Sequence, residues 1–105
     1  MTETVTDHEA EQRYELRIDD EIAAVVEYTL RPGVIALNHT ETRPDFEGQG
    51  AAARLVREVL ADVRARGLAV LPFCPYVNEF IRRHPDEYLD LVPADRRARF
   101  ELPAA

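Results

Sequence analysis

Apolar residues recur at every second position in residues 13–30. Residues 13–19 have charged side chains between them, and residues 22–30 have a second face that includes Val25, Glu27 and Thr29. This period is typical of strands with one buried face. Residues 34–40 instead begin with four consecutive apolar residues, which favours a strand covered on both faces, as in the middle of a sheet. Short turns at Asp19-Asp20 and Arg31-Pro32-Gly33 would join these strands.

A helical period follows. From residue 52 to residue 63, apolar residues recur with the spacing of one buried helical stripe, and Gly67 marks the end of that helix. Residues 68–73 predict another strand, and Pro75 suits the first position of a second helix that ends before Pro85. The order β-β-β-α-β-α predicts a small α+β fold with a mixed sheet. A three-stranded antiparallel meander is joined to a parallel strand by a right-handed helical crossover, and two main helices pack against the sheet.

The chain is long enough for one domain, predicted over residues 13–93. A chain of 105 residues buries about two-thirds of its unfolded surface, which suffices for one core. Residues 1–12 are polar, acidic and aperiodic, so we expect a disordered tail, and residues 94–105 are expected to form a loose tail. No apolar run approaches the roughly 20 residues of a membrane helix, and Cys74 is the only cysteine. These features favour a cytoplasmic monomer that does not bind membranes.

The charge is concentrated at one end of the chain. Residues 1–27 carry nine acidic and two basic residues, and the remainder is balanced. Because no basic face is apparent, we expect no binding to nucleic acid. The acidic segment is either a solvated surface or an attraction for a cationic partner. The sequence contains no lysine, which excludes a phosphate loop of the Walker A type.

A glycine-rich segment precedes the first helix. Phe46-Glu47-Gly48-Gln49-Gly50 is followed by three alanines, so the helix entrance is free of bulky side chains. The unpaired N–H groups and the dipole of a helix N-terminus attract anions, and a loop of this kind typically holds a phosphate or pyrophosphate. The alternative is a tight turn that lets the helix pack closely on the sheet. Glu47 would repel an anion if it pointed inward, so we expect it to face outward.

Two reactive side chains are expected near this loop. His39 lies towards the end of the third predicted strand and Cys74 at the end of the fourth, so parallel pairing would bring both to one end of the sheet. His39 could act as a general base, or simply be a strand-end histidine satisfied by backbone groups. Cys74 could be activated at the start of the second helix, or be a small buried hydrophobe. His8 and His84 lack metal-ligand spacing to this pair, so we expect no metal.

Four sequence blocks in this order resemble the YjdJ-type subfamily of the GNAT N-acetyltransferase superfamily. The resemblance extends from about Tyr14 to Val92. The blocks are Asn38-His39-Thr40-Glu41, Phe46-Glu47-Gly48-Gln49-Gly50, Leu71-Pro72-Phe73-Cys74-Pro75-Tyr76-Val77 and Arg83-His84-Pro85.

The resemblance implies binding of acetyl-CoA. In this superfamily a loop with a basic or amide residue at its first position cradles the CoA pyrophosphate through backbone amides, and pantetheine inserts between two parallel strands. Glu47 departs from that first position. The implied cofactor-binding residues are Thr40, Glu47, Gly48, Gln49, Gly50, Ala51, Ala52 and Asn78, and the implied catalytic residues are His39 and Cys74.

Two chemistries fit the resemblance. Either the acceptor amine attacks acetyl-CoA directly, with His39 as base and Cys74 as the acid for the leaving thiolate, or Cys74 is acetylated first. We favour direct transfer, because positioning an amine beside a thioester supplies most of what is needed. The short Asp19-Asp20 turn leaves the acceptor side open, which suits a protein or cationic amine. The alternatives are a non-catalytic module that binds CoA or acyl-CoA, and a small protein whose acidic sheet face binds a basic partner.

Overall fold

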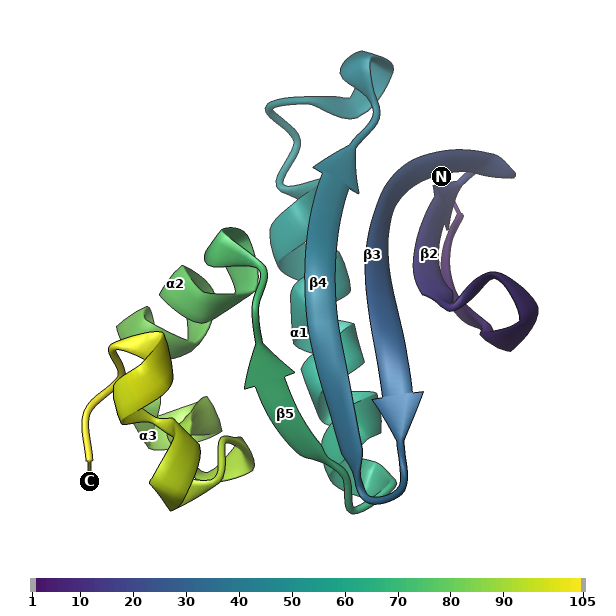
Figure 1. Cartoon of the computed structure of the whole chain (residues 1–105). Helices are drawn as coiled ribbons and strands as arrows, with labels where there is room; N and C mark the ends of the chain where they lie inside the picture. The colour runs from purple at the N-terminus through teal and green to yellow at the C-terminus, as the bar shows by residue number, and fades with distance from the viewer. Residues whose placement is uncertain (1, 105) are drawn as a thin grey trace.

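The alternating segments form one mixed, five-stranded sheet in the computed structural model, which describes residues 2–104 (Figure 1). The strands lie side by side in chain order. Each of the first four is antiparallel to its neighbour, and β5 is parallel to β4. The fold is therefore the α+β arrangement that the sequence predicts, with one additional strand at the N-terminus. The strands are β1 (Glu3–His8), β2 (Arg13–Ile18), β3 (Glu21–Arg31), β4 (Val34–Thr42) and β5 (Ala69–Pro72).

Two tight turns fix the register of the meander. Asp19 and Asp20 both have positive φ angles, of 49° and 71°, which matches the two-residue hairpin turn that follows the twist of its strands. In the second turn, Pro32 is followed by Gly33 with φ 77°, a backbone conformation that favours glycine. Both predicted turns are confirmed, and no helix intervenes between β2 and β3.

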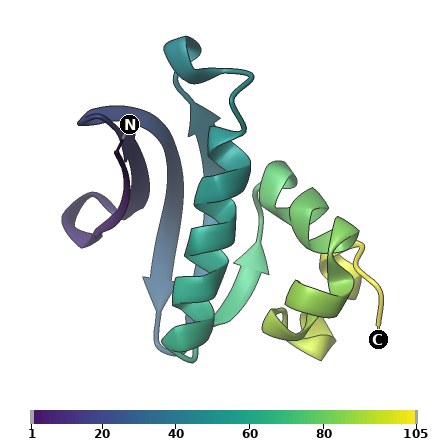
Figure 2. The same ribbon diagram turned by 180° about the vertical axis from the view of Figure 1, so that it is seen from behind.

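Helix α1 (Ala51–Ala65) connects β4 to β5 across one face of the sheet. In Figure 2, α1 faces the viewer, β4 and β5 point upward, and the chain moves to the right. The crossover is therefore right-handed, as parallel connections almost always are. Helix α2 (Pro75–Arg83) and the short helix α3 (Pro85–Tyr88) lie beyond β5.

The core lies between α1 and the sheet. The helix contributes the buried stripe that the sequence predicts, and the strands contribute every second residue. Buried residues of the helix are Ala51, Leu55, Val56, Val59, Leu60 and Val63, and buried residues of the sheet include Tyr14, Leu16, Val26, Tyr28, Ile35, Leu37 and Val70. The Tyr14 hydroxyl donates to Asp62 at 2.6 Å. Burial, with that carboxylate beside it, raises the pKa of Tyr14, so the phenol stays a neutral donor.

The described part of the N-terminal segment, residues 2–12, is ordered, contrary to the disordered tail expected for residues 1–12, of which Met1 lies outside the described residues. Residues 3–8 form β1 and pair along the whole of β2. Three long-range contacts attach this strand to the rest of the domain: Asp7 accepts from the Tyr28 hydroxyl at 2.6 Å and pairs with Arg66, and Glu3 pairs with Arg54. Because the partners lie 21 to 59 residues away, the local sequence gave no sign of them.

The C-terminal segment, described up to residue 104, is also packed against the domain, whereas a loose tail was expected for residues 94–105; Ala105 lies outside the described residues. Phe100 and Leu102 are buried, and the Phe100 ring packs edge-on against Phe73 with ring centroids 5.0 Å apart. The backbone of this segment is held by Asn78, whose amide donates to the Phe100 carbonyl at 2.9 Å. Two apolar residues among many charged ones are too few to form a periodic pattern, so the sequence analysis missed this contact.

Candidate functional site

β4 continues beyond the point at which β5 ends. The two strands pair over four residues, from Val34–Ala69 to Leu37–Pro72, and the Cys74 N–H then donates to the Leu37 carbonyl at 2.8 Å. The chain turns away into α2 at Pro75, while β4 extends to Thr42 (Figure 1). Residues 38–42 of β4 therefore have no strand beside them on the β5 side. A strand edge of this kind offers backbone donors and acceptors to an extended ligand.

A β-bulge lies at the start of this free edge. Glu27 pairs with His39 and Tyr28 with Leu37, so Asn38 is an extra residue on β4. Its side-chain amide donates to the Thr29 hydroxyl at 3.0 Å. Bulges bend a strand and redirect its side chains, and they are common next to active sites.

The two predicted catalytic residues lie on opposite faces of β4. His39 is exposed and shares the open sheet face with Glu27, its cross-strand partner. Thr40, the next residue, points to the helix-covered face, where its hydroxyl accepts from the Cys74 thiol at 3.3 Å. The Cys74 side chain is 3% exposed. Both residues lie at the end of the sheet that the sequence predicts, but they border the free edge of β4 from either side and form no contact with each other.

The glycine loop presents free backbone donors. Gly48 and Gly50 have φ angles of 80° and 73°, a conformation that residues with a Cβ rarely adopt. Helix α1 has no side-chain cap at its N-terminus. Within residues 2–104, no protein group accepts from the N–H groups of residues 51–53. Free donors and the positive end of a helix dipole are the two features by which a helix N-terminus attracts an anion.

Arg54 holds the loop in this conformation, a role that the sequence analysis missed. Its guanidinium donates to the Gln49 carbonyl at 2.6 Å and to Glu3 at 2.9 Å. Because a peptide unit is planar and trans, directing the Gln49 carbonyl towards Arg54 turns the Gly50 N–H the opposite way. The signal in the sequence was a cation in the first turn of a helix, where the dipole disfavours it.

A hollow adjoins the loop. Its volume is about 340 Å³, and it extends from the end of β4 to the start of α2. Tyr76, whose side chain is 42% exposed, also borders a second hollow of about 460 Å³ between α1 and α2. Arg57, Arg83 and Glu79 line it, and Arg83 is paired with Glu79 at 3.1 Å. The first hollow is lined by Thr42, Phe46, Glu47, Gly48, Gly50, Ala51, Ala52, Ala53 and Tyr76.

The structure places Asn78 away from this hollow. Its amide is engaged with the Phe100 carbonyl, and it borders a separate cavity of about 530 Å³ beneath the C-terminal segment. Glu47, by contrast, is exposed at the rim of the loop hollow. In the part of the chain that the structure describes, no three His, Cys, Asp or Glu side chains gather as metal ligands.

A family model described as GCN5-related N-acetyl-transferase matches residues 13–91, three-quarters of the chain. The chain belongs to the GCN5-related N-acetyltransferase family. The match begins at β2 and so leaves out β1. Within the described residues 2–104, none of the helices of this family member is both long and apolar enough to cross a bilayer.

Solved structures similar to this GCN5-related N-acetyltransferase are larger proteins. One is described as an acetyltransferase of the GNAT family from Novosphingobium aromaticivorans, with 36% identity over 58% of this chain and 28% of that chain and a TM-score of 0.47. A ribosomal-protein-alanine N-acetyltransferase from Brucella melitensis biovar Abortus has 21% identity over 71% of this chain and 58% of that chain, with a TM-score of 0.49.

A Staphylococcus aureus protein described as an acetyltransferase has 20% identity over 61% of this chain and 53% of that chain, with a TM-score of 0.47. The chain therefore spans between about a quarter and three-fifths of the structures it matches. None of the curated proteins compared with the chain matches it.

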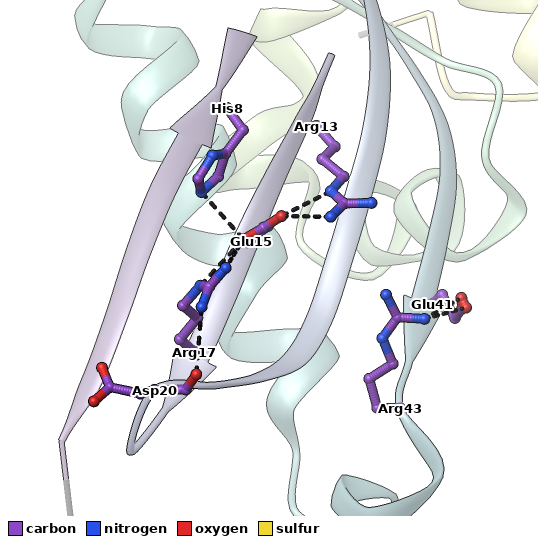
Figure 3. Close-up of polar contacts among 7 residues, drawn as sticks. All are labelled: His8, Arg13, Glu15, Arg17, Asp20, Glu41 and Arg43. Atoms are coloured by element: carbon purple, nitrogen blue, oxygen red, sulfur yellow. Dashed lines mark hydrogen bonds and ion pairs between the residues drawn. The ribbon is translucent and has the colours of Figure 1, made fainter. Parts of the chain in front are cut away.

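The open sheet face of this family member is less acidic than the sequence suggested. Glu15 is 2% exposed and is surrounded by Arg13 at 2.7 Å, Arg17 at 3.1 Å and His8 at 3.1 Å (Figure 3). Burial by itself raises the pKa of Glu15, but hydrogen bonds from the two arginines and the neighbouring imidazole outweigh it, so the pKa lies below its ordinary value. With Glu3 paired to Arg54 and Asp7 to Arg66, three of the nine acidic residues in residues 1–27 have cationic partners within the domain.

We expect Glu15→Gln to lower the free energy of unfolding by about 1–2 kcal/mol at pH 7. The loss is moderate because the three cationic partners are each about one-third exposed and can turn to water. Since folding lowers the pKa of Glu15, its contribution is complete above the unfolded pKa and disappears as the pH falls through the folded pKa. Urea unfolding of wild type and variant between pH 7 and pH 3 checks this.

Glu41→Gln is the matched control. Glu41 lies on the same face (Figure 3) but is 40% exposed and has one arginine partner, Arg43 at 3.3 Å. Glu41→Gln should lower the free energy of unfolding by less than about 0.5 kcal/mol. An equal loss in both variants would contradict a specific contribution from the buried cluster.

Proposed function

We propose that this chain is an acetyl-CoA-dependent N-acetyltransferase, of the YjdJ-type subfamily, that acts on an amine acceptor. The observation that carries the proposal is the set of unpartnered N–H groups at residues 51–53 beside the free edge of β4. The diphosphate of the cosubstrate would accept from these donors. Its extended pantetheine arm would lie along residues 38–42, as an added strand does at a sheet edge.

The positions of the glycine loop and of the free edge of β4 support the proposed binding of acetyl-CoA. The hollow beside the loop reaches Thr42 and Tyr76, which lie on the two elements that separate where β5 ends. A thioester held along the edge of β4 would lie between the open face, with His39, and the covered face, with Thr40 and Cys74. In the second hollow Arg83 is paired with Glu79, so Arg57 would supply the positive charge for a further phosphate group.

The chemistry would proceed by direct transfer. His39 takes a proton from the ammonium of the acceptor, directly or through a water molecule, and the free amine attacks the thioester carbonyl carbon. The new C–N bond forms as the C–S bond breaks, CoA leaves as a thiolate, and the nitrogen gives its second proton to solvent water. Either water or the Cys74 thiol protonates the thiolate, and in the second case Cys74 recovers its proton from water. His39 is exposed on the open face, so it could meet an amine that approaches from that side.

The geometry of Cys74 favours a supporting part over a nucleophilic one. Its thiol is buried and donates to Thr40, so attack on a thioester would first require the loss of that hydrogen bond. A thiolate leaving group, with an ordinary thiol pKa of about 8.5, needs little help from an acid at neutral pH. Replacing Cys74 should therefore lower the rate of acetyl transfer much less than replacing His39.

Incubation with acetyl-CoA and a panel of amines tests this proposal. We expect acetylated amine and free CoA in equal amounts, measured by mass spectrometry, and no acetyl adduct on the intact protein. Cys74→Ala should retain activity within about tenfold. Because the chain has no lysine, an adduct would point to Cys74 or the N-terminal amine. An adduct on Cys74 that forms and decays at the turnover rate would refute direct transfer.

The same panel separates the competing functions. Acetyl-CoA binding without acetylation of any amine would favour a module that only binds CoA. No binding, seen as no rise in melting temperature at saturating acetyl-CoA, would refute both. The panel should contain cationic and neutral amines, since the compensated charge around Glu15 weakens the expected preference for cationic acceptors.

A further inference from the structure

We infer that Glu3 is a positioning residue for the glycine loop and acts through Arg54, a role that deepens the proposed function and rests on it. Two direct contacts carry this inference. The Arg54 guanidinium donates through Nε to the Glu3 carboxylate at 2.9 Å and through Nη1 to the Gln49 carbonyl at 2.6 Å. One side chain therefore joins the first strand of the sheet to the loop proposed to bind the diphosphate of CoA.

Arg54 depends on Glu3 to stay against the loop. It lies in the first turn of α1, where the helix dipole disfavours a cation, and its side chain is 43% exposed and could turn to water. Glu58 borders the same hollow as Glu3 and Arg54 and lies four residues beyond Arg54, the spacing at which ion pairs form along a helix. The Glu3 carboxylate on β1 instead holds the guanidinium beside the loop, where a Cβ added to Gly50 would lie 3.4 Å from Nη1.

The peptide between Gln49 and Gly50 is the part of the loop that this contact orients. Its carbonyl accepts from Arg54, so its N–H points the opposite way. Within residues 2–104 the Gly50 N–H forms no hydrogen bond, and Gly50 lines the hollow beside the loop. The contact therefore presents one further donor to a bound anion, next to the donors of residues 51–53.

Glu3 belongs to a strand that the family match leaves out. The match covers residues 13–91, whereas β1 pairs along β2 and brings Glu3 to the start of α1. The same strand is also attached beyond the other end of α1, where Asp7 pairs with Arg66 at 3.2 Å. The two ion pairs join β1 to opposite ends of the helix, and only the one formed by Glu3 adjoins the glycine loop.

Calorimetric titration with CoA tests the role by the direction of the change in affinity. Glu3→Gln should weaken binding about threefold to fivefold, and Arg54→Gln about tenfold. An effect of charge alone would have opposite signs in the two variants, because one removes a negative and the other a positive charge near an anion. In the Arg54→Gln background, Glu3→Gln should have no further effect. Tighter or unchanged binding in Glu3→Gln overturns the inference.

Two controls separate positioning from attachment of β1 and from charge. Asp7→Asn removes the ion pair at the other end of α1 and should leave the affinity for CoA within about twofold of wild type. Equal weakening in Asp7→Asn and Glu3→Gln would overturn a specific role for Glu3. Arg54→Lys keeps the charge but lacks the planar fork that reaches both partners, so it should also weaken binding. Wild-type affinity in Arg54→Lys would mean that charge suffices, which contradicts positioning.

The amide nitrogen of Gly50 reports the role without any ligand. A hydrogen bond to a peptide carbonyl polarises the whole peptide and moves the NMR resonance of its nitrogen downfield. The Gly50 nitrogen resonance should therefore move upfield in Glu3→Gln and Arg54→Gln and stay in place in Asp7→Asn. An unchanged resonance in Glu3→Gln overturns the inference. If the wild type binds no CoA, the proposed function fails, while the Gly50 resonance still decides whether Glu3 positions the loop.

Discussion

Replacing Ala52 by glutamate should weaken binding of CoA about 100-fold. The side chain at this position lines the hollow beside the glycine loop, so a carboxylate there would lie within about 5 Å of the diphosphate and repel it by roughly 3 kcal/mol at the dielectric of a protein surface. Calorimetric titration with CoA measures the loss. The domain itself should become slightly more stable, by about 0.3–1 kcal/mol, because an acid near a helix N-terminus complements the dipole.

Two control variants separate the effect of the negative charge in Ala52→Glu from the effects of side-chain size and position. Ala52→Gln adds a side chain of the same size without the charge and should weaken binding less than tenfold. Ala61→Glu adds the same charge to the exposed surface of α1, nine residues further along and about 14 Å away, beyond the screening length of physiological salt. Equal affinities in Ala52→Glu and Ala61→Glu would place the anion site elsewhere.

Replacing His39 by glutamine should lower kcat about 100-fold or more at pH 7. An acceptor amine with a pKa near 10 is almost entirely protonated at that pH, so without a base only the small neutral fraction can attack. The affinity for CoA should be unchanged, since His39 lies on the face of β4 opposite Thr40 and Cys74. Steady-state kinetics with a fixed amine and saturating acetyl-CoA provide the measurement.

The pH dependence of kcat distinguishes the loss of a base from misfolding of the His39→Gln variant. As the pH approaches the pKa of the amine, solvent removes the proton, and the variant should approach the wild-type rate. His8→Gln is the control: His8 is bonded to Glu15 on β1, three strands away from β4, and its loss should leave kcat unchanged. A constant ratio of variant to wild-type rate across the pH range would argue against a proton-accepting role.

The sequence anticipated much of the fold because the relevant signals are local. Alternation in residues 13–30 identified two strands, the stripe of α1 identified the long helix, and the turn residues Asp19-Asp20 and Gly33 separated the strands. The parallel pairing of β4 with β5 followed from the length of the connection. Each of these inferences depends on residues close together in the chain.

β1 and the C-terminal turns were missed for the opposite reason. The backbone of β1 forms its hydrogen bonds with β2. Its side chains Glu3 and Asp7 pair with Arg54 of α1 and with Arg66, which follows α1 directly. An acidic segment without a period carries no sign of such distant partners. Phe100 is buried only because Phe73 and Asn78 provide a surface for it.

The features of the candidate site also fall into those set by local sequence and those set by distant parts of the chain. The residue types and their order along the chain determined the glycine loop, its uncapped helix and the presence of His39 and Cys74 near one end of the sheet, because spacing along strands and helices fixes these features. Only the tertiary structure decided which face each side chain occupies. One extra residue at Asn38 reverses the alternation of β4, and an exposed arginine, Arg54, sets the direction of a loop carbonyl. The bulge depends on the pairing with β3, and the Arg54 side chain is oriented in part by Glu3 of β1, so both rest on partners that are distant in the sequence.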